Sequence, residues 1–144
     1  MSVQLPITDK NFVEKIIPQK KPFVMVDSLL EYTDESLKSG YTVEESNIFV
    51  ENGVFQAPGI LEHQAQSVAL HTGYQYFMKN EEPPVGYIGA VKTFTVETLP
   101  TSGDRLETSI RIISEIMGVT LVKTETKIGE IIVAESEMKT VIKP

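Results

Sequence analysis

The sequence predicts an α+β fold in which a mostly antiparallel sheet packs around one long helix. Two strand-like segments come first, a helical segment rich in small residues follows, and four more strand-like segments complete the chain. The last four segments are joined by short turns, which connect antiparallel neighbours, whereas parallel strands need long crossovers. A chain of 144 residues fits one domain with a sizeable hydrophobic core. We therefore expect a single domain over residues 1–144.

The N-terminal third predicts a short helix followed by two strands. Thr8 or Asp9 is a candidate N-cap, apolar residues follow at helical spacing, and Pro18 ends the segment. The next stretch has the dense apolar character of a buried strand, and a second strand follows after a short turn. These two strands are expected in PFVMVDSLLEYT and SLKSGYTVEE, with the turn at TDES.

The middle of the chain predicts a long buried helix. Asn52-Gly53 is a strong turn signal and Pro58-Gly59 is a second break, so the approach to the helix is expected to be irregular. From Ile60 to about Met78, apolar and small residues recur every three or four positions. Because this segment is rich in Ala, Gln, Ser and Gly, neighbouring backbone can approach it closely.

The remaining chain predicts four strands. In one of them Val122, Thr124 and Thr126 alternate with charged residues, the period-two pattern of a sheet with one buried face. The strands are expected in VGYIGAVKTFTVE, DRLETSIRIISEI, TLVKTETKI and IIVAESEMKTVI, with turns at LPTSGD, MG and IGE.

Charge and composition exclude several classes of function. The formal net charge is -7 and only two arginines are present, whereas non-specific nucleic-acid binding needs dense Lys and Arg. The absence of cysteine excludes disulfides, thiolate metal sites and a cysteine nucleophile, and it suits the cytoplasm.

His63 and His71 lack the spacing of a helical metal pair, and no stretch is long and apolar enough to span a membrane. The one tight basic pair, Lys20-Lys21, is expected to be a solvated loop rather than a docking patch.

Three stretches carry a family resemblance, and they lie in the right order between Ile16 and Ile110. IIPQKKPFVMVDSLLEY resembles an LPHRxPFLLVDxV opening, APGILEHQAQSVAL resembles an MPGVLxxEALAQ helix start, and GYIGAVKTFTVETLPTSGDRLETSI resembles a GIxxARFxxPVxPGDxL strand pair. These patterns are those of FabZ-type 3-hydroxyacyl-[acyl-carrier-protein] dehydratases. The run EHQAQSVALHTG looks closer to the ApeP-like branch of these dehydratases, which resemble partners in aryl polyene and related pigment pathways.

The resemblance implies a hotdog fold, in which an antiparallel sheet wraps one long central helix, and a site built on the helix glutamate. In the family, a His from a GHFPG loop removes the proton next to the thioester carbonyl, and the Glu protonates the leaving hydroxyl. Glu62 precedes Gln66 by four residues, as the family Glu precedes the Gln of EALAQ, so the acid–base role is carried to Glu62. Gln66 lies one turn later on the same side and is expected to orient the carboxyl. A plainer interpretation is that Glu62 is only a first-turn carboxylate favoured by the helix dipole.

The histidine of the family pattern is missing. Val54 stands in GVF where the family has GHF, and Gln19 stands where LPHR places a histidine. His63 lies about 100° around the helix from Glu62, so their side chains diverge within one chain. We expect His63 or Asn52, brought from a second chain, to be the next contributor to catalysis.

The resemblance also implies a substrate, partners and an assembly. The substrate is expected to be an acyl thioester on phosphopantetheine, presented by an acyl carrier protein, with no metal or resident cofactor. We expect a homodimer or higher even-numbered oligomer, or a heteromer with an active dehydratase. The alternatives are a catalytically silent acyl-binding hotdog partner, and a thioesterase in which Glu62 activates water. Residues expected to bind substrate in an apolar tunnel along the helix are Gln66, Val54, Phe55, Gly59, Ile60, Tyr87 and Ile88.

Overall fold

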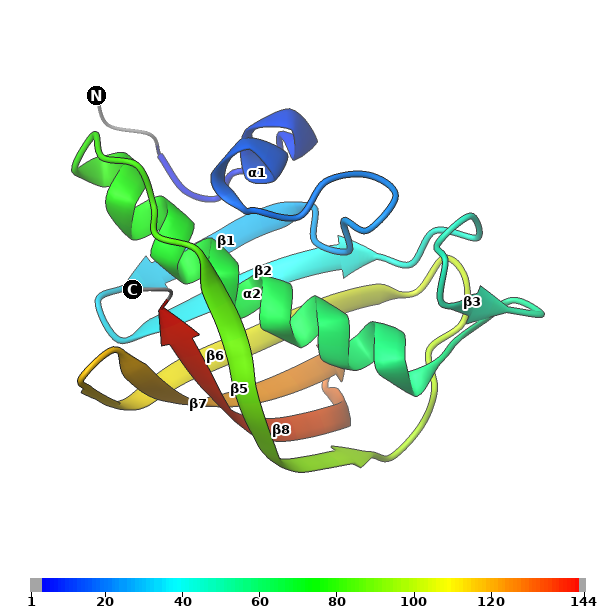
Figure 1. Cartoon of the computed structure of the whole chain (residues 1–144). Coiled ribbons are helices and arrows are strands. Elements are labelled where there is room, and N and C mark those ends of the chain that lie inside the picture. Colours follow the sequence, from blue (N-terminus) through cyan, green and yellow to red (C-terminus); the bar gives the residue numbers. More distant parts are fainter. Residues whose placement is uncertain (1–3, 143–144) are drawn as a thin grey trace.

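A six-stranded antiparallel sheet curves around one long helix in the computed structural model, which describes residues 4–142 (Figure 1). The order of strands in the sheet is β1-β2-β6-β7-β8-β5, and the long helix α2 contacts β2, β5, β6 and β7. This arrangement confirms the predicted α+β architecture with an antiparallel sheet around a central helix. The elements are α1 (Lys10–Ile16), β1 (Ser28–Thr33), β2 (Ser36–Thr42), β3 (Val50–Glu51), β4 (Val54–Phe55), α2 (Ala57–Met78), β5 (Gly86–Val96), β6 (Arg105–Ile116), β7 (Val119–Ile128) and β8 (Ile131–Ile142).

The short helix α1 begins as predicted and packs against α2. Asp9 is its N-cap, since the Asp9 carboxylate accepts a hydrogen bond from the Asn11 backbone N–H at 2.9 Å. The carbonyl of Ile16, at the other end of α1, lies so close to Gly73 of α2 that a Cβ there would clash with it. The small residues of α2 therefore do allow close approach of backbone, as the sequence predicted.

The helix α2 begins three residues earlier than the sequence predicted. It starts at Ala57, and Pro58-Gly59, predicted to be a break, forms part of its first turn. Proline is tolerated there because the first N–H groups of a helix have no partner inside the helix. No described helix is long and apolar enough to cross a membrane.

Only the second half of the first predicted strand is part of the sheet. The ladder with β2 starts at Ser28, whereas the Phe23–Met25 backbone lies outside the sheet. Side chains of α2 bind this backbone instead: the Met25 N–H donates to Gln66 Oε1 at 2.7 Å, and the Met25 carbonyl accepts from His63 at 2.6 Å. The apolar pattern correctly predicted burial, but the hydrogen bonds come from a helix rather than from a neighbouring strand.

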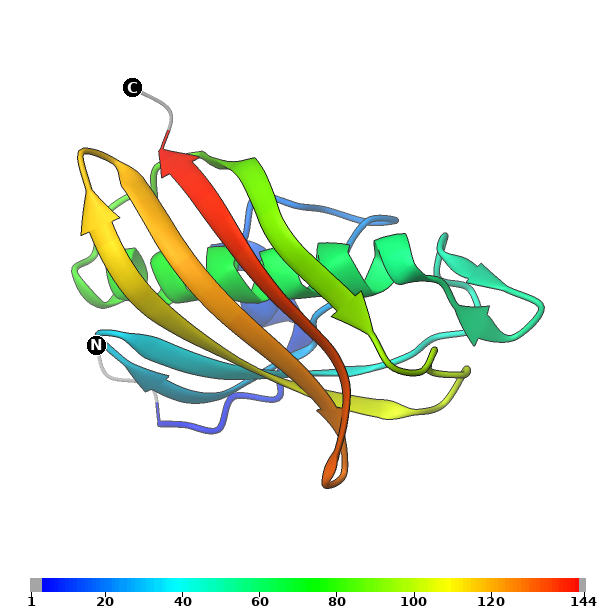
Figure 2. The ribbon, with the colours of Figure 1, turned by 90° about the horizontal axis from the view of Figure 1, so that it is seen from below.

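Strand β5 forms one border of the sheet, where it lies beside β8 (Figure 2). Among the described residues it pairs with β8 alone, so its other edge is free. Large apolar side chains are exposed along the first half of this strand and just before it, with Val85 at 47%, Tyr87 at 53% and Val91 at 40%. A long edge with exposed apolar side chains favours pairing with another chain.

Candidate functional site

An open groove of about 630 Å³ lies beside the N-terminal turns of α2. Two loops form its other walls, one between α1 and β1 and one before β3. Its surface is largely apolar, with two lysines on one side, and Glu62 is the only carboxylate among the lining residues that the structure describes. The lining residues are Pro18, Gln19, Lys20, Lys21, Phe23, Met25, Ile48, Phe49 and Glu62.

The carboxylate of Glu62 accepts a hydrogen bond from the buried side-chain amide of Gln66. Glu62 is half-buried, and Gln66 Nε2 donates to its Oε2 at 2.7 Å. The same nitrogen donates to the Phe23 carbonyl at 2.6 Å, while Gln66 Oε1 accepts from the Met25 N–H. Turning the amide over would place its oxygen against two acceptors, so this network allows one orientation. Gln66 thus makes the contact with Glu62 that the sequence predicted.

His63 lies in the core rather than in the groove. Its side chain has no exposed surface, its Nδ1 lies 2.6 Å from the Met25 carbonyl oxygen, and its Nε2 lies 2.7 Å from Thr108 Oγ1. Burial lowers the pKa of His63 to about 4, so the ring is neutral at physiological pH. Both nitrogens are occupied, which leaves His63 without a lone pair or a proton for a substrate.

His71 is also a packed histidine. Its Nε2 lies 2.9 Å from the Thr33 carbonyl oxygen, and its ring stacks on Tyr32. Burial lowers the pKa of His71 below its usual value. The structure therefore brings neither histidine of the chain to the Glu62 groove.

The β3–β4 hairpin carries Asn52 and Val54 beyond the N-terminal end of α2 (Figure 1). Asn52 and Gly53 both have positive φ, 53° and 78°, which confirms the predicted turn. Asn52 is exposed at the hairpin tip and Val54 is half-buried, and neither lines the groove of its own chain. Asn52 can act on a ligand of Glu62 only if another chain brings it there.

Most of the predicted substrate-binding residues are elsewhere. Phe55 and Ile60 are completely buried in the core, and Gly59 lets the Phe55 ring approach the helix. Tyr87 and Ile88 are exposed on the free edge strand β5. None of these five lines the Glu62 groove of a single chain, so a closed tunnel of the predicted composition is not formed by one chain.

Sequence reasoning missed several residues that do line the groove. The sequence predicts a solvated pair for Lys20 and Lys21 and a strand position for Phe23, whereas all three line the groove. The Lys20 ammonium donates to the carbonyls of Glu14 and Ile17, the latter at 2.9 Å, which fixes the loop after α1. Lys21 is exposed and has no ion pair within residues 4–142. The signal that pointed to this loop was its place in the first family motif, since the motif includes PQKKPF.

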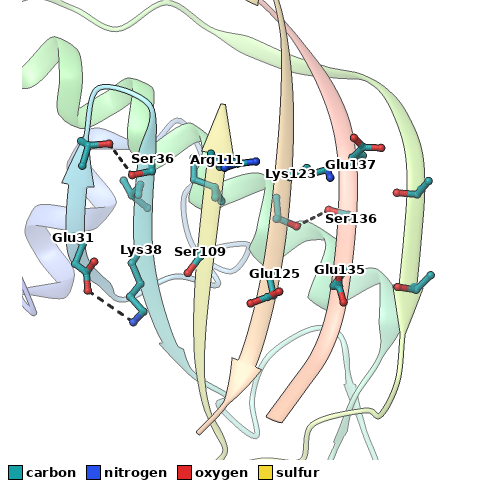
Figure 3. A pocket seen from close by; sticks show the side chains of 16 residues that line it. Glu31, Ser36, Lys38, Ser109, Arg111, Lys123, Glu125, Glu135, Ser136 and Glu137 are labelled. Atoms are coloured by element: carbon teal, nitrogen blue, oxygen red, sulfur yellow. Dashed lines mark hydrogen bonds and ion pairs between the residues drawn. The ribbon is translucent and has the colours of Figure 1, made fainter. Parts of the chain in front are cut away.

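A second hollow, also of about 630 Å³, lies on the face of the sheet opposite α2 (Figure 3). Polar side chains from all six strands of the sheet line it, and Lys38 forms an ion pair with Glu31 at 3.8 Å. Its mixed charges make it a poor receptor for an acyl chain. The labelled residues are Glu31, Ser36, Lys38, Ser109, Arg111, Lys123, Glu125, Glu135, Ser136 and Glu137.

Comparisons with known proteins agree with the sheet wrapped around a central helix and give the family of the chain. A family model described as ApeP-like, ApeP dehydratase, matches residues 12–144. A 3-hydroxyacyl-[acyl-carrier-protein] dehydratase FabZ of Shewanella sp. strain MR-4 is 28% identical, over 96% of this chain and 94% of the relative. The dehydratase heterocomplex ApeI:P of Xenorhabdus doucetiae has a similar structure, with a TM-score of 0.86 and 15% identity over 99% of this chain and 93% of that one. A hypothetical thioesterase of Streptococcus pneumoniae TIGR4, solved with coenzyme A, has a TM-score of 0.64 and 9% identity over 80% and 84%. The hotdog fold predicted from the sequence is confirmed.

Proposed function

Because the chain belongs to the ApeP-like dehydratase family, we propose that it acts in the dehydration of a 3-hydroxyacyl thioester with Glu62 as the acid–base carboxyl. The observation that carries this proposal is the position of Glu62, a single carboxylate in an open groove, held by the buried amide of Gln66. The similarity to FabZ dehydratases supports the same class of reaction.

The proposed reaction removes a proton from the carbon next to the thioester carbonyl, forms a carbon–carbon double bond and releases the 3-hydroxyl group as water. Ionised Glu62 removes the proton from the carbon and then, as the protonated acid, gives it to the departing hydroxyl oxygen, so one carboxyl acts as both base and acid. Water leaves, the carboxylate is regenerated, and Gln66 Nε2 stabilises this ionised form. The carbonyl oxygen also needs a hydrogen-bond donor. His63 cannot supply it, because both of its nitrogens are bonded inside the core. We propose that a second chain completes the site, with the Asn52 amide as the donor.

The groove suits an acyl group carried on phosphopantetheine. Phe23, Ile48 and Phe49 offer apolar surface to the chain of the substrate, and the Lys21 ammonium at the same groove suits an anionic phosphate. We therefore propose an acyl carrier protein as the partner that delivers the substrate, and no cofactor held by this chain.

A second candidate function is that of a subunit which binds substrate beside an active dehydratase. The observation that favours it is Val54, which stands where the family pattern has its histidine. The similar structure from Xenorhabdus doucetiae is a heterocomplex of dehydratases, which supports assembly with a second kind of subunit. In this alternative the partner supplies the base and this chain supplies the groove.

Assembly through the free edge of β5 is expected, because pairing there covers both the unpaired backbone and the exposed Tyr87 and Val91 side chains. Sedimentation should show a species larger than the 16.0 kDa chain. Replacing both Tyr87 and Val91 by lysine should weaken the dimer by about 100-fold, since like charges would face each other across the twofold axis. Ile131→Lys, at the start of β8 where the side chain is 66% exposed, is the matched control and should leave assembly unchanged. A wild-type chain that sediments at 16.0 kDa when dilute would contradict this expectation.

The two candidate functions are separated by an assay of the wild-type chain alone and mixed with a hotdog dehydratase that retains the histidine. Dehydration of a 3-hydroxyacyl-acyl-carrier-protein by the chain alone supports the enzyme. Stimulation only in the mixture, with co-elution of both chains, supports the partner subunit. Hydrolysis of a simple acyl thioester without dehydration would instead indicate a thioesterase. If no mixture shows dehydration or binds an acyl thioester, both proposals are wrong.

A further inference from the structure

A chain of hydrogen bonds, linked through the backbone of Met25, crosses the core and ends at the Glu62 carboxylate. Every member except Glu62 is completely buried. The donor–acceptor distances along the chain lie between 2.6 and 3.0 Å. In order, its members are Gln64, Thr126, Thr108, His63, Met25, Gln66 and Glu62.

The direction of each hydrogen bond follows from the groups that can only donate or only accept. The Met25 carbonyl can only accept, so His63 Nδ1 carries a hydrogen. The ring is neutral, so its Nε2 accepts a hydrogen bond, and the donor is the Thr108 hydroxyl. Thr108 has then used its only hydrogen, so the Thr126 hydroxyl donates to Thr108 at 2.7 Å. The amide nitrogen of Gln64 donates to Thr126 at 3.0 Å, which gives the same direction from the other end.

The remaining links point the same way. The Met25 N–H donates to Gln66 Oε1, which leaves both hydrogens of Gln66 Nε2 for the Phe23 carbonyl and for Glu62 Oε2. All six links therefore donate toward Glu62. The four links up to the Met25 carbonyl and the two from the Met25 N–H lie on different peptide groups, so aligned bonds polarise one another within each part, and Met25 joins the two parts through its position.

We propose that His63 is a positioning residue for Glu62. By holding the Met25 carbonyl, His63 keeps the Met25 N–H against Gln66, and Gln66 in turn holds one carboxylate oxygen. The other oxygen of Glu62 is left for the ligand in the groove. His63 itself touches no substrate. The consequence for catalysis rests on the proposed function of Glu62, whereas the chain of hydrogen bonds does not.

Two substitutions of His63 separate the two halves of its role. Asparagine places an amide nitrogen near the position of Nδ1 and can still donate to Met25, whereas glutamine reaches toward the position of Nε2 and Thr108. We expect His63→Gln to speed hydrogen exchange of the Met25 N–H and of the Gln66 side-chain amide by about tenfold or more, because a buried bond is lost. His63→Asn should change both rates by less than about threefold. His71→Asn, at the other buried histidine, is the matched control and should change neither.

Kinetics give the second measurement. If Glu62 acts as proposed, His63→Gln lowers kcat by about tenfold with little change in KM, because the groove stays intact, and His63→Asn restores most of the rate. If the wild-type chain has no dehydratase activity but the exchange rates respond as expected, the proposed function fails and the link from His63 to Gln66 stands. Equal exchange effects of His63→Gln and His63→Asn would overturn the positioning role.

A third measurement needs no variant. The ring nitrogens of His63, one of only two histidines, should give the ¹⁵N signature of a neutral ring protonated at Nδ1 between pH 8 and 5. A ring protonated at Nε2 would reverse the bond to Thr108 and would refute the proposed chain.

Discussion

Glu62→Gln is expected to lower kcat/KM for a 3-hydroxyacyl thioester by about 10²- to 10⁴-fold, the usual contribution of a general acid or base. Glutamine keeps the size of the side chain and can still contact Gln66, but its amide cannot protonate a departing hydroxyl. Because the groove and its apolar walls are unchanged, KM should change little. The assay measures dehydration of a 3-hydroxyacyl thioester and, separately, hydrolysis of a simple acyl thioester.

The control for this experiment is Glu45→Gln, which removes an exposed carboxylate that does not line the groove. It should retain the activity of the wild type. Loss of dehydration alone in Glu62→Gln supports the dehydratase, and loss of hydrolysis alone supports the thioesterase. Full activity of Glu62→Gln would mean that Glu62 is only a carboxylate near a helix N-terminus, favoured there by the helix dipole.

Phe55→Ala is expected to lower the free energy of unfolding by about 3–5 kcal/mol, as for other aromatic side chains removed from a packed core. Phe55 has no exposed surface, packs against Tyr41 and fills the space beside Gly59. Denaturant unfolding followed by circular dichroism measures the change. The sequence suggested Phe55 as a residue of the substrate tunnel, so this result separates a core role from a lining role.

Phe23→Ala is the matched control, since it removes the same side chain from the groove, where Phe23 is 55% exposed. It should change the free energy of unfolding by no more than about 0.5 kcal/mol, the usual range for surface positions. It should also weaken binding of an acyl thioester, because it removes apolar surface from the groove. A loss of less than about 1 kcal/mol in Phe55→Ala would indicate that Phe55 borders empty space rather than core.

Local signals were sufficient wherever one segment of the chain determines its own structure. Asp9 caps α1 because its carboxylate reaches an N–H two residues away, and the turn at Asn52-Gly53 needs only residues that tolerate positive φ. The helix ends at Met78, as its periodicity predicted, and β7 follows the alternation of its side chains, with Val122, Thr124 and Thr126 buried. The start of α2 was misplaced, because a proline in a first turn has the same local signature as a proline in a loop.

The sequence by itself determined the order of elements, the antiparallel character of the sheet, the family, and Glu62 with Gln66 one turn later. These follow from periodicity, short turns and motifs, all of which act over a few residues. Only the tertiary structure decided what surrounds Glu62. The Phe23–Met25 segment reaches α2 through hydrogen bonds to side chains 38 to 43 residues away, and these contacts leave no local pattern in the sequence. These contacts place His63 in the core and Phe23 and Lys21 at the groove, whereas the order of strands in the sheet leaves Tyr87 on a free edge. Burial and hydrogen bonding are satisfied by the whole fold rather than by neighbours in the chain.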